Sequence, residues 1–205
     1  LIGRGAPIPT LVVVDVAARE RAYLRVAGPD ACDYLQRMVS NDVEALQVGD
    51  ACPALLLTAK ARVIAPLVVW RRGEGDFLLL TEPELGEPVH ALLVRMRMRA
   101  KCEIELEEHT SALVFGGDGI ATDFPGAREV LDDTSLAATL DAEELERRRI
   151  EARVPRWGRE IDDRVLPAEA GLESTHVSFS KGCYPGQEPV ARLHYRGKAN
   201  RAVRV

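Results

Sequence analysis

The chain has 205 residues, of which 46% are hydrophobic and 29% are charged, a balance typical of a globular protein and not of a disordered or fibrous one. Its formal net charge of −5 at pH 7 argues against a non-specific nucleic-acid binder, because such proteins carry an overall basic field. No apolar stretch approaches the roughly 20 residues that a transmembrane helix needs. We therefore expect no direct nucleic-acid partner, no membrane and, without a secretory leader, a cytoplasmic location.

The four cysteines are scattered along the sequence, with no CxxC and no histidine at ligand spacing. This pattern predicts neither a metal site nor a disulfide framework, and it suits a reducing compartment. Cys32, Cys52 and Cys102 lie inside apolar or alternating stretches, where a small buried hydrophobic residue is the favoured interpretation. Cys183 is set apart, because it lies in a region rich in glycine and proline.

The first half of the chain predicts a helix followed by an antiparallel meander. Residues 21–26 have strand character, and Gly28-Pro29-Asp30 starts a helix with a shared apolar face. The apolar runs 52–58, 62–70 and 77–81 are separated by short turns. We expect these three runs to form neighbouring antiparallel strands.

Three more elements follow in chain order. A helix is predicted from about Pro83, and the alternation in residues 101–107 predicts a half-buried strand. Asp141 followed by Glu144 resembles a capping box, which predicts a helix over about 142–152. The order indicates an α+β fold, with helices packed on one face of mainly antiparallel sheets. We divide the chain into an α+β domain over 1–110 and a second α+β segment over 111–205.

Arg95, Arg97 and Arg99 stand at alternate positions of the second predicted helix. They could be taken for a nucleic-acid stripe. Alternate residues lie about 200° apart on a helix, however, so these arginines do not share one face. A solvated helix is the favoured interpretation.

The segment around Cys183 carries the strongest chemical signal. An ammonium group at Lys181 and the start of a predicted helix at 186–193 would both stabilise a thiolate over a thiol, although a small residue packed in a tight turn explains the cysteine equally well. Gln187 and Glu188 either hold a polar ligand or cap the helix. Arg192 belongs to a basic tail that suits a small acidic ligand or a solvated segment.

The run KGCYPGQEPVAR, residues 181–192, resembles the KGCYxGQExxAR signature of YgfZ proteins. Residues 28–31 and 40–43 resemble the GPDA and TND stretches shared with the glycine-cleavage T-protein, an aminomethyltransferase. Residues 158–171 are similar to the GxEID…PxEAG stretch of that family. The resemblance therefore covers most of the chain. It implies a T-protein-like fold, and because that family carries a β-barrel after the signature, we expect the C-terminal barrel to be missing here.

The resemblance implies tetrahydrofolate or a derivative as cofactor, and it makes the domain over 1–110 the expected folate-pocket domain. A pterin-facing carboxylate is expected at Glu169, because a carboxylate accepts two hydrogen bonds from a pterin, and Asn41 is expected to line the same pocket. A glutamate in a surface turn and a polar residue after a helix are the alternatives. Within the signature, the residues expected near the folate are Lys181, Tyr184, Gln187, Glu188 and Arg192.

The same resemblance implies an accessory protein that supports maturation or repair of iron-sulfur enzymes, with Cys183 as a reactive thiol and iron-sulfur client proteins as partners. Two alternatives are a tetrahydrofolate-dependent aminomethyltransferase and a folate-storing module. The T-protein carries an acidic pair where this sequence has Ala65 and Pro66. We therefore expect no aminomethyl transfer, because neither side chain can exchange a proton or stabilise positive charge.

Overall fold

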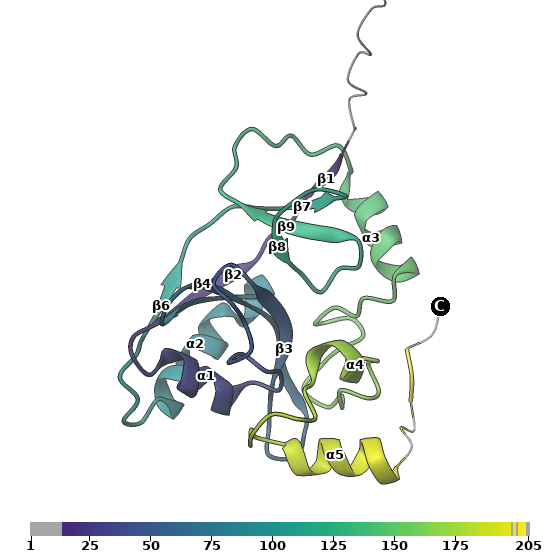
Figure 1. Cartoon of the computed structure of the whole chain (residues 1–205). Helices are drawn as coiled ribbons and strands as arrows, with labels where there is room; N and C mark the ends of the chain where they lie inside the picture. Colours follow the sequence, from purple (N-terminus) through teal and green to yellow (C-terminus); the bar gives the residue numbers. More distant parts are fainter. Residues whose placement is uncertain (1–13, 198, 200, 204–205) are drawn as a thin grey trace, which may run out of the picture.

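A five-stranded antiparallel sheet forms the centre of the molecule in this computed structural model, which describes residues 14–197, 199 and 201–203 (Figure 1). The strand order is β3-β4-β5-β2-β6. The meander predicted from the three apolar runs is confirmed, since β3 pairs with β4 and β4 with β5. The strands are β2 (Ala22–Ala27), β3 (Ala51–Leu57), β4 (Val63–Gly73), β5 (Asp76–Thr81) and β6 (Glu103–Glu107).

Two helices, α1 (Ala31–Met38) and α2 (Gly86–Met96), cover one face of this sheet, and the 3-10 turn η1 (Pro83–Leu85) precedes α2. Their apolar faces pack on alternate residues of the strands to form the main core. The predicted α+β arrangement is thus confirmed. The turn before α1 requires glycine, because Gly28 has φ +142° and a Cβ there would lie 2.4 Å from the Lys101 carbonyl oxygen.

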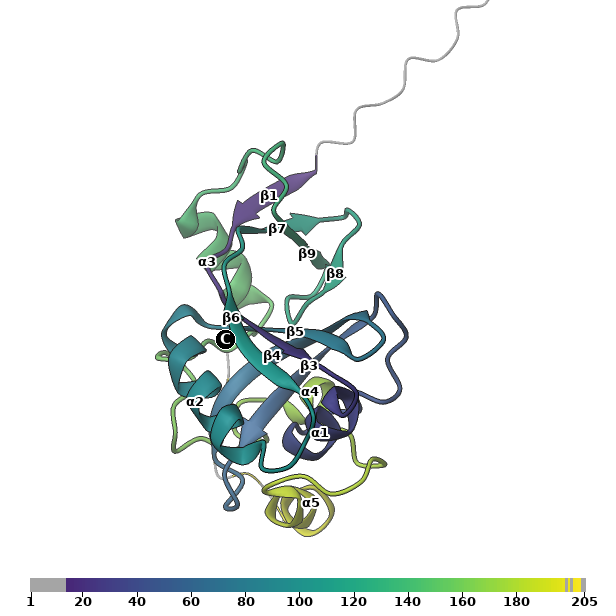
Figure 2. The same ribbon diagram turned by 90° about the vertical axis from the view of Figure 1, so that its left-hand side faces the viewer.

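A second, four-stranded antiparallel sheet lies above the first, beside α3 (Ala142–Glu151) (Figures 1 and 2). Its order is β1-β7-β9-β8, with β1 (Asp15–Ala18), β7 (Ser111–Phe115), β8 (Ile120–Ala121) and β9 (Ala127–Leu131). The helix predicted over about 142–152 is confirmed. Asp141 caps it by accepting the Glu144 amide at 2.8 Å, whereas the Glu144 carboxylate pairs with Arg147 at 2.7 Å.

The two sheets are joined by the chain, which runs from β1 in the second sheet into β2 in the first, and by a buried cluster of charged side chains. β1, from the start of the chain, pairs with β7, so the sheet that follows residue 110 includes a strand from before it. Arg21, just before β2, donates to Glu129 on β9 at 3.2 Å, and both side chains are almost completely buried. Burial by itself would raise the pKa of Glu129, but the neighbouring arginines hold it below its usual range. The division at residue 110 stays a prediction.

The C-terminal segment packs against the central sheet at the ends of β3 and β4 that meet in the β3–β4 turn. It contains α4 (Glu173–His176) and α5 (Gln187–Arg196), the latter confirming the helix predicted after the signature cysteine. Leu55 and Val63 of the sheet pack against Ile161, Tyr184 and Val190 in one buried cluster. Both views place α5 at the opposite end of the molecule from the second sheet (Figures 1 and 2). Among the described residues, no helix is long and apolar enough to cross a membrane.

Candidate functional site

The signature loop, residues 177–186, connects α4 to α5 and is docked onto the segment that follows α1. The Ser40 hydroxyl donates to the His176 carbonyl at 2.6 Å and accepts the Leu55 amide at 2.9 Å. The Ser178 amide donates to the Ser40 carbonyl at 3.0 Å. Residues that resemble the TND and KGC stretches therefore form one structural unit, although about 140 positions separate Ser40 from the loop in sequence.

Lys181 fastens the loop to the end of α1. Its buried ammonium donates to the carbonyls of Gln36 at 2.6 Å, Val39 at 2.7 Å and Asn41 at 2.8 Å. Carbonyls at a helix C-terminus lack intrahelical partners and form the negative end of the helix dipole, so a cation is well placed there. Burial lowers the pKa of Lys181 to about 8, which leaves it mostly protonated at neutral pH.

This arrangement changes the interpretation of Lys181. A lysine ammonium has three donors, and all three are engaged by the backbone carbonyls of residues 36–41. No donor remains for the Cys183 thiolate or for a folate oxygen. The contribution of Lys181 in this structure is to position the loop, a role that spacing could not reveal because it depends on a distant helix end.

The other side of the loop is anchored by Tyr184 and Gly186. The Tyr184 ring is buried against the central sheet, and burial raises the pKa of its hydroxyl to about 12. Gly186, the residue before α5, has φ +81°, and a Cβ there would lie 2.5 Å from the Thr58 carbonyl oxygen. The turn between β3 and β4 therefore leaves space only for glycine at this position.

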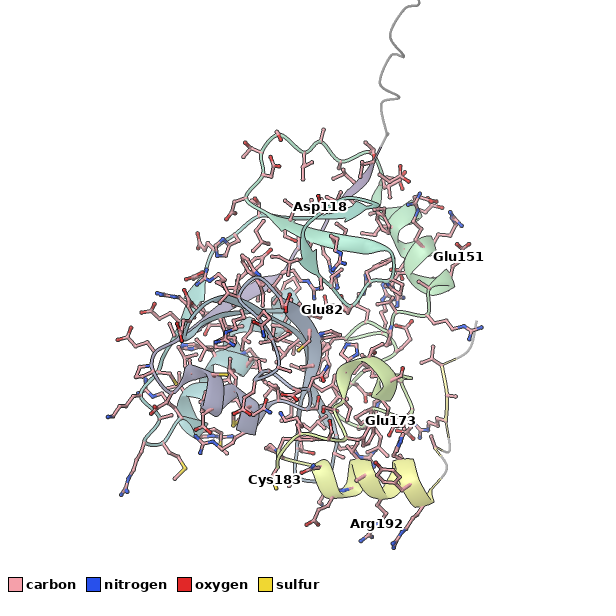
Figure 3. The ribbon with its side chains drawn as sticks, viewed as in Figure 1. Glu82, Asp118, Glu151, Glu173, Cys183 and Arg192 are labelled. Carbon is pink, nitrogen blue, oxygen red and sulfur yellow. The ribbon has the colours of Figure 1, made fainter. Side chains whose placement is uncertain are left out.

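Cys183 lies between the anchor residues Lys181 and Tyr184 and is exposed (Figure 3). Nothing lies within 4 Å of a Cβ placed on its neighbour Gly182. The remaining cysteines are buried or half-buried, and burial raises the pKa values of Cys32, Cys102 and Cys52, the last to about 12. The fold thus holds one thiol at the surface on a rigid loop and keeps three protonated and partly enclosed.

The three signature residues on α5 point to a different environment. Gln187 is half-buried, while Glu188 and Arg192 are exposed, Arg192 at the outer edge of the molecule (Figure 3). Within the part of the chain that the structure describes, none of the three forms a side-chain hydrogen bond, and α5 has no side-chain cap. The capping role considered for Gln187 and Glu188 is therefore not used, and their role toward a ligand stays a prediction.

Asn41 and Glu169 are both tied into local structure. The Asn41 amide donates to the carbonyls of Pro53 at 2.7 Å and Thr175 at 3.1 Å, which uses both of its donors. The Glu169 carboxylate accepts the Leu166 amide at 3.0 Å and lies 3.8 Å from the Arg62 guanidinium. The Asn41 side-chain oxygen also accepts the Asp42 amide at 2.9 Å. A role of either residue toward a folate stays a prediction.

A cavity of about 860 Å³ lies where the second sheet, α3 and the loop 154–159 meet the end of β5. None of the signature residues 177–192 and neither Asn41 nor Glu169 lines it. Glu82 reaches it from the region between the two sheets (Figure 3), and burial raises the pKa of this carboxyl group. Its chemically informative lining residues are Arg19, Glu82, Glu84, Phe124, Arg156, Trp157 and Arg159.

The sequence analysis missed this cavity. Its walls come from residues 17–20, 82–84, 113–124 and 140–159, which no single motif spans. The available signal was local: Trp157, one of two tryptophans, stands between the chain breakers Pro155 and Gly158.

Among the described residues, no group of three or more histidine, cysteine, aspartate or glutamate side chains is arranged to hold a metal ion.

Comparison with known proteins decides the family. A family model described as the GCVT N-terminal domain matches residues 11–146. The chain belongs to this family. The sequence is 23% identical to an iron-sulfur cluster assembly factor IBA57 homologue of Neurospora crassa, over 89% of this chain and 51% of that protein. It is 27% identical to the tRNA-modifying protein YgfZ of Serratia proteamaculans, over 92% of this chain and 69% of that protein.

The fold of this GCVT-family chain is also found in a solved structure. The glycine cleavage system aminomethyltransferase T from Bartonella henselae superposes with a TM-score of 0.73 at 16% identity, covering 90% of this chain and 64% of that one. The predicted relation to YgfZ and T-protein is confirmed. The chain spans about half the length of the Neurospora relative.

Strand β4 carries no carboxylate side chain. Ala65 and Pro66 lie buried in the middle of β4, and no Asp or Glu occurs between Val63 and Gly73. The Pro66 carbonyl accepts a hydrogen bond from the Thr81 hydroxyl at 2.8 Å. This contact joins β4 to the end of β5, next to the cavity residue Glu82.

Proposed function

We propose that this chain is a folate-binding accessory protein that acts in the cytoplasm and supports the maturation or repair of iron-sulfur enzymes through the thiol of Cys183. The observation that carries the proposal is a loop with one exposed cysteine, anchored by Lys181 on one side and Gly186 on the other. Relatives named as an iron-sulfur cluster assembly factor and as a tRNA-modifying protein support the same direction.

The cavity is our candidate folate site. Its volume of about 860 Å³ falls within the roughly 300–1,000 Å³ of small-molecule sites. Trp157 offers an aromatic surface to a pterin, and the Glu82 carboxylate can accept hydrogen bonds from pterin N–H groups. Arg156 and Arg159 are suited to the carboxylates of the folate glutamate tail. The aromatic, acidic and basic side chains of the cavity thus correspond to the pterin ring, the pterin N–H groups and the glutamate tail of a reduced folate.

Titration with tetrahydrofolate, followed by tryptophan fluorescence and calorimetry, tests this site. Glu82→Gln should weaken binding about ten- to a hundredfold, the loss expected for one charge-assisted hydrogen bond. Glu169→Gln is the matched variant, because it makes the same change at the position implied by family resemblance. A loss only in Glu169→Gln would move the folate there, and no saturable binding by the unaltered chain would end the folate proposal.

The role of the thiol is tested in cells. Cys183→Ser should lower the activity of iron-sulfur enzymes while the protein level stays unchanged, because the exposed side chain makes few packing contacts. Cys32→Ser, at a half-buried position, is the control and should leave those activities unchanged. Equal activity in both strains would remove Cys183 from the function.

The alternative function is aminomethyl transfer, which the fold of the structural neighbour favours. We propose that this chain does not perform it, because Ala65 and Pro66 cannot supply the proton exchange and charge stabilisation that positioned groups convert into roughly 10²–10⁴-fold in rate. Ammonia release from an aminomethylated lipoyl carrier with tetrahydrofolate is the measurement. Release at enzyme-like rates would replace the accessory role with the transferase.

A further inference from the structure

Helix α2 ends at Met96, so Arg97 and Arg99 lie in the turn into β6 and not on the helix predicted for them. This turn and the end of α2 combine positive charge with exposed apolar side chains. Residues 94–101 read VRMRMRAK and contain four cations without an acidic residue. Met98 is 87% exposed, and Val94 and Met96 are 40% and 42% exposed. We call residues 94–101 the basic turn.

The cations of the basic turn are not neutralised by the rest of the molecule. Within the described residues, none of Arg95, Arg97, Arg99 and Lys101 forms an ion pair within 4 Å. By contrast, the arginines between the two sheets and on α3 are paired with carboxylates. The Arg97 guanidinium donates to the Cys102 carbonyl at 3.1 Å. A local positive surface thus exists on a chain whose net charge is −5.

The basic turn is held in a fixed shape. The Asp30 carboxylate accepts the Lys101 amide at 2.7 Å, and Gly28 lies so close to the turn that no side chain would fit between them. Met98 has φ +50°, a conformation that disfavours residues other than glycine, asparagine and aspartate. The fold therefore holds an exposed methionine in a strained backbone conformation, within a turn that is fixed by the Asp30–Lys101 hydrogen bond.

We propose that the basic turn is the docking surface for an acidic segment of a partner protein. A cluster of cations attracts acidic side chains over roughly one Debye length, about 8 Å at physiological ionic strength. Methionine adapts its shape to apolar side chains of a partner, which a phosphate backbone does not offer. The sequence 94–101 also has no aromatic residue on which a nucleobase would stack.

The surface is separate from the proposed thiol and folate sites. Figure 1 shows the turn between α2 and β6 to the left of α5, and none of its residues lines the 860 Å³ cavity. The proposal therefore does not depend on the proposed function.

Fluorescence anisotropy with labelled peptides tests the proposal. The probes are a peptide of alternating glutamate and leucine, a peptide of alternating glutamate and serine with the same length and charge, and a 20-nucleotide oligouridine. The glutamate-leucine peptide should bind tighter than the other two, and its affinity should fall with added salt. The triple reversal Arg95→Glu, Arg99→Glu, Lys101→Glu should weaken it at least tenfold, and Met98→Ser should weaken it severalfold.

The matched control reverses three exposed cations elsewhere, Lys60→Glu, Arg128→Glu and Arg153→Glu, which gives the same net charge. It should change the affinity less than threefold. An equal loss in the control would reduce the effect to net charge and overturn the proposal. Tighter binding of the oligouridine that depends on Arg95, Arg99 and Lys101 would overturn it in favour of RNA, and no saturable peptide binding would overturn it outright. Unchanged circular dichroism of the variants excludes misfolding.

Discussion

The ammonium of Lys181 donates a 2.7 Å hydrogen bond to the carbonyl of Val39, the residue directly after α1. The same ammonium serves two further carbonyls, so this side chain joins the N-terminal helix to the signature loop. The loop that presents Cys183 is consequently anchored to the core by a buried side chain.

Replacing Lys181 tests this anchor. Lys181→Met keeps the length of the side chain but leaves three carbonyls without a donor, and we expect the free energy of unfolding to fall by about 3 kcal/mol. Urea denaturation measures it. Lys60→Met, at the exposed turn between β3 and β4, is the control and should stay within about 0.5 kcal/mol. Equal denaturation midpoints would show that the anchor contributes no stability.

Cys183 should be the first cysteine to be alkylated in the folded protein. It is exposed, whereas burial disfavours the thiolate of Cys52, whose pKa is raised to about 12. Iodoacetamide labelling at pH 7.5, mapped by mass spectrometry over time, measures the order. In urea all four cysteines should react at similar rates. Earlier labelling of Cys32, Cys52 or Cys102 in the folded protein would contradict the prediction.

Gly186→Ala should destabilise the protein more than Gly171→Ala. Both glycines have positive φ, +81° and +72°, so the backbone strain is similar. A Cβ at Gly186 would also meet the Thr58 carbonyl, whereas nothing lies within 4 Å of one at Gly171. We expect losses of about 3 and about 1 kcal/mol in thermal or urea unfolding. Equal losses would mean that the loop shifts freely away from the β3–β4 turn.

His109 should make stability depend on pH above neutrality. Burial alone would lower its pKa, but hydrogen bonds to Glu107 at 2.9 Å and Asp132 at 2.6 Å outweigh burial and raise it. A raised pKa in the folded state gives a contribution that is full below the unfolded value, about 6.5, and is lost as the pH rises through the folded value.

The measurement is the free energy of unfolding between pH 5.5 and 9 for the unaltered chain and for His109→Gln. The difference between them should be largest at pH 5.5–6.5 and should shrink as the pH rises. Glu107, whose pKa is lowered to about 2 mainly by its hydrogen bond to Arg72, stays ionised throughout this range. A difference that is constant with pH would show that His109 contributes through packing and not through charge.

The sequence alone was sufficient for the local elements. The helix after Gly28, the strands of the central meander, the helix over about 142–152 and the helix after Gly186 were all predicted near their observed bounds. Each depends on interactions within a few residues: apolar periodicity, a cap such as Asp141, or a glycine turn. The signature 181–192 also sufficed to indicate the family, because nine of its twelve positions carry the match.

Tertiary structure decided what the site residues do. Lys181 stands two positions before Cys183 in sequence, yet its ammonium is used by carbonyls about 140 positions away, because the end of α1 leaves acceptors without intrahelical donors. The cavity beside Glu82 and Trp157 is built from four separated stretches of chain. Hydrogen-bond partners and cavities depend on which segments distant in sequence come into contact, and local periodicity carries no information about those long-range contacts.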